Sequence, residues 1–294
     1  MITFRHHVVT IIAVFVALAA GVALGGGPLS ELGRPDAADD RADTTQTAAQ
    51  TTSGFDEAFI AAVGPGLVSG RLSEQKVALV TMPGADETVV TALTEQVAAA
   101  GGALTGTYRL AADMTQPSQK SLVDTLGSQV MAQQQEAADP EASTYVRMGQ
   151  LLAYAAASPD GASPVNGKAR GVREAVVGAG LLDEPGQVEE RAPLVLVVLG
   201  SQPAADGGDA ILAGIVEGLA SRAQGTVVVG STEDGADGQL TALRASAGVA
   251  LAATVDGTDR PAGRTAAVLA LARSISTDGG SFGASGADGP VPLG

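Results

Sequence analysis

The sequence predicts an α/β fold: a largely parallel sheet with helices on both faces, preceded by a single N-terminal transmembrane helix. Short apolar runs such as KVALVT (76–81) and LVLVVL (194–199) have the composition of strands that are buried on both faces. Segments with helical apolar spacing separate these runs, and such alternation is typical of parallel sheets. One uncharged segment, long enough to span a bilayer, comes before all of them.

Residues 1–27 are predicted to form the membrane anchor. No charged residue occurs between Val8 and Leu24, a stretch that has Phe15 near its middle. A helix of about 20 residues spans roughly 30 Å of hydrocarbon. Arg5 precedes the segment and acidic residues dominate the sequence after it, so the positive-inside rule places the N-terminus in the cytoplasm. We therefore expect a single-pass plasma membrane protein whose folded domain is extracytoplasmic.

A cleaved signal segment is the alternative reading of the same residues. The run 17–19 (Ala-Leu-Ala) matches the small-x-small pattern of signal peptidase sites. Cleavage there would leave a short but sufficient apolar region, residues 8–16. The domain would then be exported and not tethered, and both readings place it outside the cytoplasm.

Residues 28–74 are predicted to be a flexible spacer with one short helix. The stretch 35–54 is rich in Asp, Thr, Ala and Gln, and it offers little apolar surface to offset the entropy of ordering. After it, apolar residues recur at helical spacing. The short helix has an apolar face of Phe55, Phe59, Ile60 and Val63 and is expected to stop at Gly64-Pro65-Gly66.

Residues 75–276 are predicted to be the α/β domain. Its first half contains a strand at 76–81, a helix capped by Asp86 and a strand at 103–110, which together form a βαβ unit. Three helices follow, beginning near Thr115, Asp139 and Arg170. The second half alternates more regularly, with expected strands at 194–199, 226–230 and 251–255 and helices at 210–223, 240–247 and 263–275. The tail, residues 277–294, is expected to be disordered.

Charge and composition exclude several classes of function. The net charge is −15 and the pI about 4.4, so we expect no nucleic acid partner. The chain has no Cys, and its two His lie at 6 and 7, before the folded region. A Ser-His-acid triad and a zinc site built on His or Cys are therefore excluded from that region. No phosphate-binding loop follows a strand. We expect no enzyme and no evident cofactor.

Carboxylates at the ends of strands are the weak candidates for a metal site. Asp256 and Asp259 follow the strand that ends at Val255. Ligands of open α/β sheets bind outside the carboxyl ends of strands, so these residues could bind a cation, or serve an enzyme as the least favoured hypothesis. Turn and helix-cap chemistry explains the same residue types and is the favoured alternative.

Four stretches of the chain resemble one family. They are the N-terminal ITFRHHVVTIIAVFVALAAGVALGGGPL, then KVALVTMPGAD with GGALTG at 101–106, then LVLVVLG, then TVDGTDRPAGRTAAVLALA. Together they resemble the actinobacterial MctB family, the mycobacterial copper transport protein B family. The resemblance covers most of the chain and implies a cell-envelope protein associated with copper transport or efflux. Copper itself is implied by the family name only.

The sequence departs from the family pattern at two places. Relatives have a charged coiled coil after the anchor, whereas residues 34–54 here show no heptads. Relatives also tend to have a Gly-His-Tyr-Gly segment near the C-terminus, where this chain has Gly280-Ser281-Phe282-Gly283.

Copper(I) prefers Cys and Met ligands. The Met residues beyond the anchor are dispersed along the sequence and are expected to serve in packing: Met82, Met114, Met131 and Met148. The short apolar strands also lack the alternation expected of a membrane pore. We therefore expect the protein to act by binding an envelope partner protein. The alternative is a structural or regulatory envelope or division protein without a metal role.

Overall fold

The structure, a computed structural model, describes residues 35–201 and 206–293. The expected anchor residues Arg5, Val8, Phe15 and Leu24 lie outside these ranges. Within them, no helix combines the length and the apolar character needed to cross a membrane. The chain divides into two compact units, Met1–Ala58 and Phe59–Gly294, and the second contains the sheet.

The sheet has six strands, and every neighbouring pair is parallel. Their order in space is β2-β1-β5-β6-β7-β8. In chain order the strands are β1 (Lys76–Thr81), β2 (Ala103–Arg109), β5 (Leu194–Val198), β6 (Gly225–Val229), β7 (Ala253–Val255) and β8 (Ser281–Phe282). A separate antiparallel pair joins β3 (Ser163–Pro164) to β4 (Glu190–Arg191).

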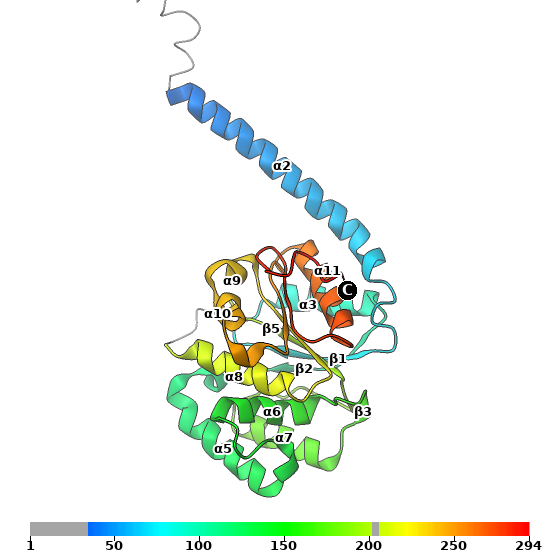
Figure 1. Ribbon diagram of the computed structural model, residues 1–294, viewed down its shortest axis with the longest axis vertical. Helices are drawn as coiled ribbons and strands as arrows, with labels where there is room; N and C mark the ends of the chain where they lie inside the picture. Colours follow the sequence, from blue (N-terminus) through cyan, green and yellow to red (C-terminus); the bar gives the residue numbers. More distant parts are fainter. Residues whose placement is uncertain (1–34, 202–205, 294) are drawn as a thin grey trace, which may run out of the picture. The chain divides into compact units, whose positions relative to one another are not determined.

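The central strands are almost wholly apolar because helices cover both faces of the sheet. Alternate residues of β1 and β5 point to opposite sides. Val77 and Leu194 belong to one buried cluster, together with side chains of α3 (Glu87–Ala99) and α11 (Pro261–Arg273). Val80 and Val195 belong to the other, together with side chains of α8 (Gly208–Ala220). The expected parallel sheet with helices on both faces is confirmed (Figure 1).

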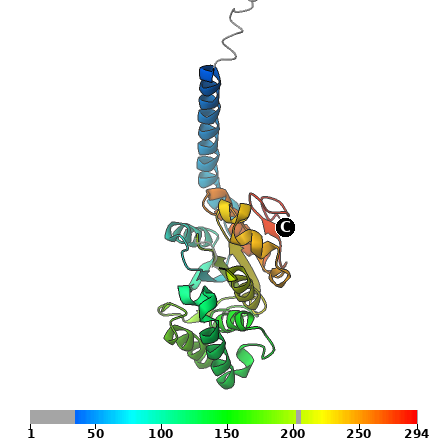
Figure 2. The ribbon, with the colours of Figure 1, turned by 90° about the vertical axis from the view of Figure 1, so that its left-hand side faces the viewer.

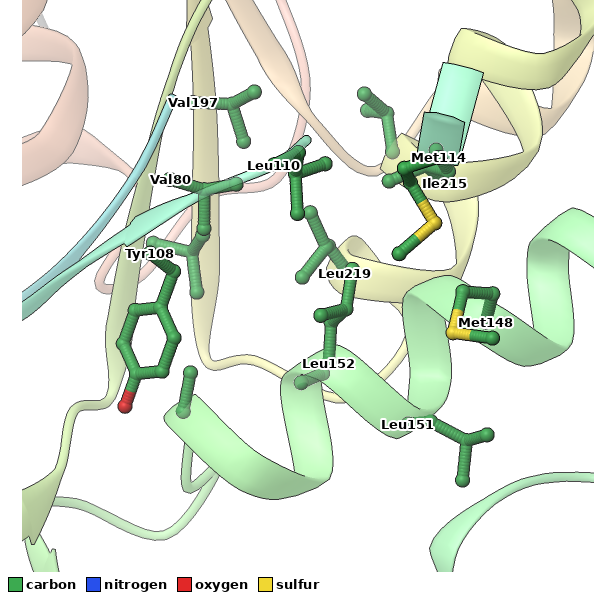
Figure 3. Close-up of a cluster of buried hydrophobic side chains, with 14 of the residues drawn as sticks. Val80, Tyr108, Leu110, Met114, Met148, Leu151, Leu152, Val197, Ile215 and Leu219 are labelled. Atoms are coloured by element: carbon green, nitrogen blue, oxygen red, sulfur yellow. The ribbon is translucent and has the colours of Figure 1, made fainter. Parts of the chain in front are cut away.

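The middle of the chain forms a second helical layer beneath α8 (Figures 1 and 2). This layer consists of α5 (Lys120–Gln133), α6 (Thr144–Ala156) and α7 (Gly167–Gly178). α6 contacts α8 along one side and α5 and α7 on others, and Met148 and Leu151 on it are fully buried. Figure 3 shows this core, in which Leu152 and Leu219 approach one another between α6 and α8.

The start of α6 differs from the expected position at Asp139. The helix begins at Thr144 because residues 139–142 form a turn, in which Ala142 N donates to Asp139 O at 3.2 Å. Gln150 Oε1 accepts a hydrogen bond from Asp139 N at 2.7 Å and so fixes this turn against α6. The remaining short elements are α4 (Ala112–Thr115), η2 (Pro117–Gln119), η3 (Gln135–Ala137), α9 (Thr232–Asp237), α10 (Gln239–Arg244) and η4 (Ala247–Val249).

The expected flexible spacer is instead largely helical. α2 is one helix from Pro35 to Val68, and it continues through Pro65, where a stop was expected. Ala-rich sequence has high helix propensity even when it offers little apolar surface. At the end of α2, Val68 is fully buried, and Gly64 packs so closely that a Cβ atom there would lie 2.8 Å from Thr265 Oγ1. Tertiary contacts thus extend the helix past its breaking residues.

The expected disordered tail also takes part in the fold. β8 adds to the edge of the sheet beside β7, and Phe282 is buried in the α3–α11 cluster with 5% exposure. The Arg273 guanidinium lies over the Phe282 ring, 5.4 Å from its centre. A single buried aromatic residue in a sequence of small residues therefore orders the segment around it.

Candidate functional site at the carboxyl edge of the sheet

The strand order places a topological reversal between β1 and β5. β2 lies on one side of β1, and the strands that follow later in the chain lie on the other. In doubly wound sheets, ligands bind outside the carboxyl ends of the strands, at such a reversal. The carboxyl edge is therefore where a site should be sought.

At the reversal, the loops after β1 and β5 touch one another. Ser201 donates hydrogen bonds to Gly84 O from its backbone N at 3.2 Å and from its hydroxyl at 3.4 Å. A Cβ atom at Gly200 would lie only 1.9 Å from Pro83 O, so the glycine permits this backbone contact. The two loops thus occupy the space at this point with their own backbones.

Asp256 follows β7 and is completely buried. Its carboxylate accepts a hydrogen bond from Arg244 Nη2 at 2.8 Å and one from Ser285 N at 3.0 Å. Arg244 also donates to Thr254 Oγ1 and Phe282 O. The pair joins α10, β7 and the C-terminal segment, so this aspartate holds the fold together through a buried charge-assisted network.

Asp259 lies apart from this network and is partly exposed. Its Oδ1 accepts hydrogen bonds from Thr232 N at 2.7 Å and Thr232 Oγ1 at 2.9 Å. The carboxylate thereby ties the loop after β7 to the start of α9. Across residues 35–201 and 206–293, no three acidic or histidine residues form a group that could hold a metal ion. The two aspartates therefore have separate structural partners.

Sequence reasoning did not identify Arg244 as the partner of Asp256. Arg244 ends a short helix, and nothing in its sequence neighbourhood distinguishes it from a surface arginine. Only the pairing of β7 with β8 encloses its guanidinium, which also donates to Ser285 Oγ at 2.9 Å. Three-dimensional contacts alone reveal this role.

Beside Arg244 there is an open cavity of about 340 Å³. Leu243, Val249 and Ala252 contribute its apolar wall, and Thr254 and Asp288 its polar part. Asp288 Oδ2 already accepts a hydrogen bond from Ser281 N at 2.8 Å. Thr254 and Asp288 are therefore hydrogen-bonded within the chain, and the lining of the cavity does not indicate one class of ligand.

A capping box at the carboxyl end of β6 begins α9, and its contribution to stability can be measured by mutation. Ser231 Oγ accepts from Asp234 N at 3.1 Å, and Asp234 Oδ2 accepts from Ser231 N at 2.8 Å. We expect Ser231→Ala to lower the free energy of unfolding by about 1 kcal/mol, because the Asp234 amide at the start of the helix loses its side-chain acceptor. Urea denaturation followed by circular dichroism measures this change. Ser231→Thr should retain most of the stability, and equal losses in both variants would contradict the capping role.

The methionines, the soft donors of the described residues, lie mainly in the core. Met82, Met114 and Met148 are at most 4% exposed. Figure 3 shows Met114 and Met148 among Leu and Ile side chains of the α6–α8 cluster. Their thioethers contact apolar groups, which is the ordinary packing role of methionine. The expected packing role agrees with this placement.

Comparison with known proteins gives one consistent family. The family model described as "Copper transport outer membrane protein, MctB" matches residues 1–292. A protein named "Copper transporter MctB" from Mycobacterium bovis is 29% identical over 254 residues, which cover 78% of this chain and 78% of that protein. Proteins of the same name from two strains of Mycobacterium tuberculosis match with the same identity and coverage. Since the match extends over nearly the whole sequence, this chain belongs to the MctB family of copper transport outer membrane proteins.

Proposed function

We propose that this protein is a membrane-anchored accessory of copper transport in the cell envelope, and that it acts by binding a partner protein and not as a pore or an enzyme. Family membership supports the link to copper and to a membrane. The N-terminal apolar segment supports a single-pass anchor with the α/β domain on the extracytoplasmic side. The partner and the topology are parts of this proposal.

One observation supports the accessory role above all. Five of the side chains considered as copper ligands already serve the fold: Met82, Met114, Met148, Asp256 and Asp259. Three methionine thioethers are packed in the apolar core. Asp256 is neutralised by Arg244, and Asp259 binds the backbone of α9. Copper would have to disrupt these contacts in order to bind there, which favours a domain that works through its surface.

Replacing the core methionines tests whether their sulfur atoms bind copper. We expect Met114→Leu and Met148→Leu to cost less than about 1.5 kcal/mol each, since volume-conserving swaps are well tolerated. Both variants should restore copper tolerance to a deletion strain as fully as the unmodified gene. The measurement is growth over a copper series, together with urea denaturation of the purified full chain. A folded variant that fails to restore tolerance would show that the thioethers bind copper.

A structural or regulatory envelope protein without a metal role is the second candidate. The observation that favours this second candidate is that the loops at the carboxyl edge of the sheet form hydrogen bonds with one another and so stabilise the fold. The deletion strain separates the two candidates. Increased copper sensitivity with normal septa supports the accessory role, whereas wall or septum defects with unchanged copper tolerance support the second.

A further inference from the structure

The end of α2 contains three consecutive residues that disfavour a helix: Gly64, Pro65 and Gly66. Pro65 has no N–H group, so the Ala61 carbonyl cannot accept the usual helical hydrogen bond from it. Relative to alanine, a proline lowers the equilibrium for helix formation by about two orders of magnitude, and a glycine lowers it by roughly fivefold. The helix therefore gains little intrinsic stability from continuing through this segment.

Contacts with the domain support the helix at this segment and beyond it. Gly64 is buried, and a Cβ atom there would lie 2.8 Å from Thr265 Oγ1 on α11. Val68, in the last turn of α2, is fully buried in the cluster formed with α3 and α11. Leu72 is also fully buried, and its N donates to Ala100 O at 2.9 Å. The chain is thus fixed to the domain from Gly64 onward.

The part of α2 that precedes Gly64 has less support. Ala58, Ala61 and Ala62 are exposed. Among the described residues of α2, Val68 is the first that belongs to either buried cluster. No helix or strand within the described ranges shares extended packing with α2. The contact at Gly64 therefore lies at the boundary between the weakly supported and the firmly packed parts of the helix.

We propose that Gly64, Pro65 and Gly66 form a hinge, and that the contact of Gly64 with Thr265 is the latch that keeps α2 continuous. In the latched state the helix runs through Pro65. In the released state α2 bends at the hinge, whereas Val68 stays in its cluster. Because the two states differ by the contacts of one turn, a partner that binds one of them better shifts the balance. The hinge would let the domain tilt relative to the membrane, a consequence that rests on the proposed anchor.

Distance measurements between two spin labels test the hinge, and they need only two introduced cysteines because the chain has none. Labels at Asp56→Cys on α2 and Glu95→Cys on α3, both exposed positions, report the angle between α2 and the domain. We expect two distance populations in the labelled full chain in detergent. Pro65→Ala combined with Gly66→Ala should leave one narrow population. The matched control is Gly54→Ala, a glycine of α2 before the labels, which should leave both populations unchanged.

A pair of variants tests the latch separately. Gly64→Ala places a methyl group against Thr265 Oγ1, which is held by its hydrogen bond to Pro261 O at 3.0 Å. We expect this variant to enlarge the released population. Adding Thr265→Ala removes the crowding oxygen and should restore the original populations. Circular dichroism verifies that each variant is folded.

Two results would overturn the proposal. A single narrow population in the unmodified chain, equal to that of Pro65→Ala with Gly66→Ala, would show that there is no hinge. Unchanged populations in Gly64→Ala, or a change that Thr265→Ala does not reverse, would show that this contact is not the latch. Both readouts depend on the labelled positions alone, so a failure of the proposed copper role leaves them unaffected.

Discussion

Replacing Arg244 by methionine is expected to lower the free energy of unfolding by about 3 to 5 kcal/mol. The substitution leaves the Asp256 carboxylate, which is 0% exposed, without its counterion. It also removes hydrogen bonds to Thr254 Oγ1 and Phe282 O, and with them the connection between β7 and the C-terminal segment. Urea denaturation of the full chain, followed by far-UV circular dichroism, measures the loss.

Two further variants make this prediction specific to the buried pair. Lys168→Met removes an exposed partner of Glu136 and should change stability far less, because solvent screens that pair. The double variant Arg244→Met with Asp256→Leu replaces both charges by apolar groups and should recover much of the loss. A double variant as unstable as the single one would show that packing, and not the uncompensated charge, determines the effect.

Replacing Gly218 by alanine is expected to lower the free energy of unfolding by about 3 kcal/mol, at the upper end of the range for overpacking. α6 and α8 cross so closely that a Cβ atom at Gly218 would lie 2.2 Å from Val146 O and 2.7 Å from Gln150 N. Both neighbours are backbone atoms, so the helices must move apart. That movement would loosen the cluster that contains Met148 and Leu219.

The control for this variant is Gly171→Ala on α7. A Cβ atom at Gly171 meets nothing within 4 Å, so only the gain in helix propensity remains. That gain is about 1 kcal/mol in favour of alanine. Both variants are compared by the same urea denaturation. If Gly218→Ala is as stable as the unmodified protein, the close approach of α6 and α8 does not limit the packing of this core.

Most elements of the sheet were predictable from local sequence. The runs at 76–81 and 194–199 are short and almost wholly apolar, which is the pattern of a strand covered on both faces. The Asp86 cap was predictable for the same reason, since Asp86 Oδ1 accepts from Thr88 N at 2.7 Å within one turn of chain. Interactions that span few residues leave a readable pattern in the sequence.

Elements that depend on distant contacts were not predictable. β8 has two residues and exists because Phe282 fills the core below it and Arg244 binds its carbonyl. α2 continues through Pro65 because two residues near its end, Gly64 and Val68, are packed in the domain. The candidate site has the same limit. The sequence places Asp256 and Asp259 after a strand, but it does not reveal that Asp256 pairs with Arg244 and Asp259 with Thr232.

Residue order alone is enough to recognise the strand–helix alternation, the apolar N-terminal segment and the acidic, cysteine-free composition. These properties depend on residue type and on short spacings, which the order of residues records directly. The pairing of Arg244 with Asp256 became visible only in the folded chain, because residues far apart in sequence meet there. Burial changes the energy of a charge by several kcal/mol, and burial is a property of the folded chain as a whole.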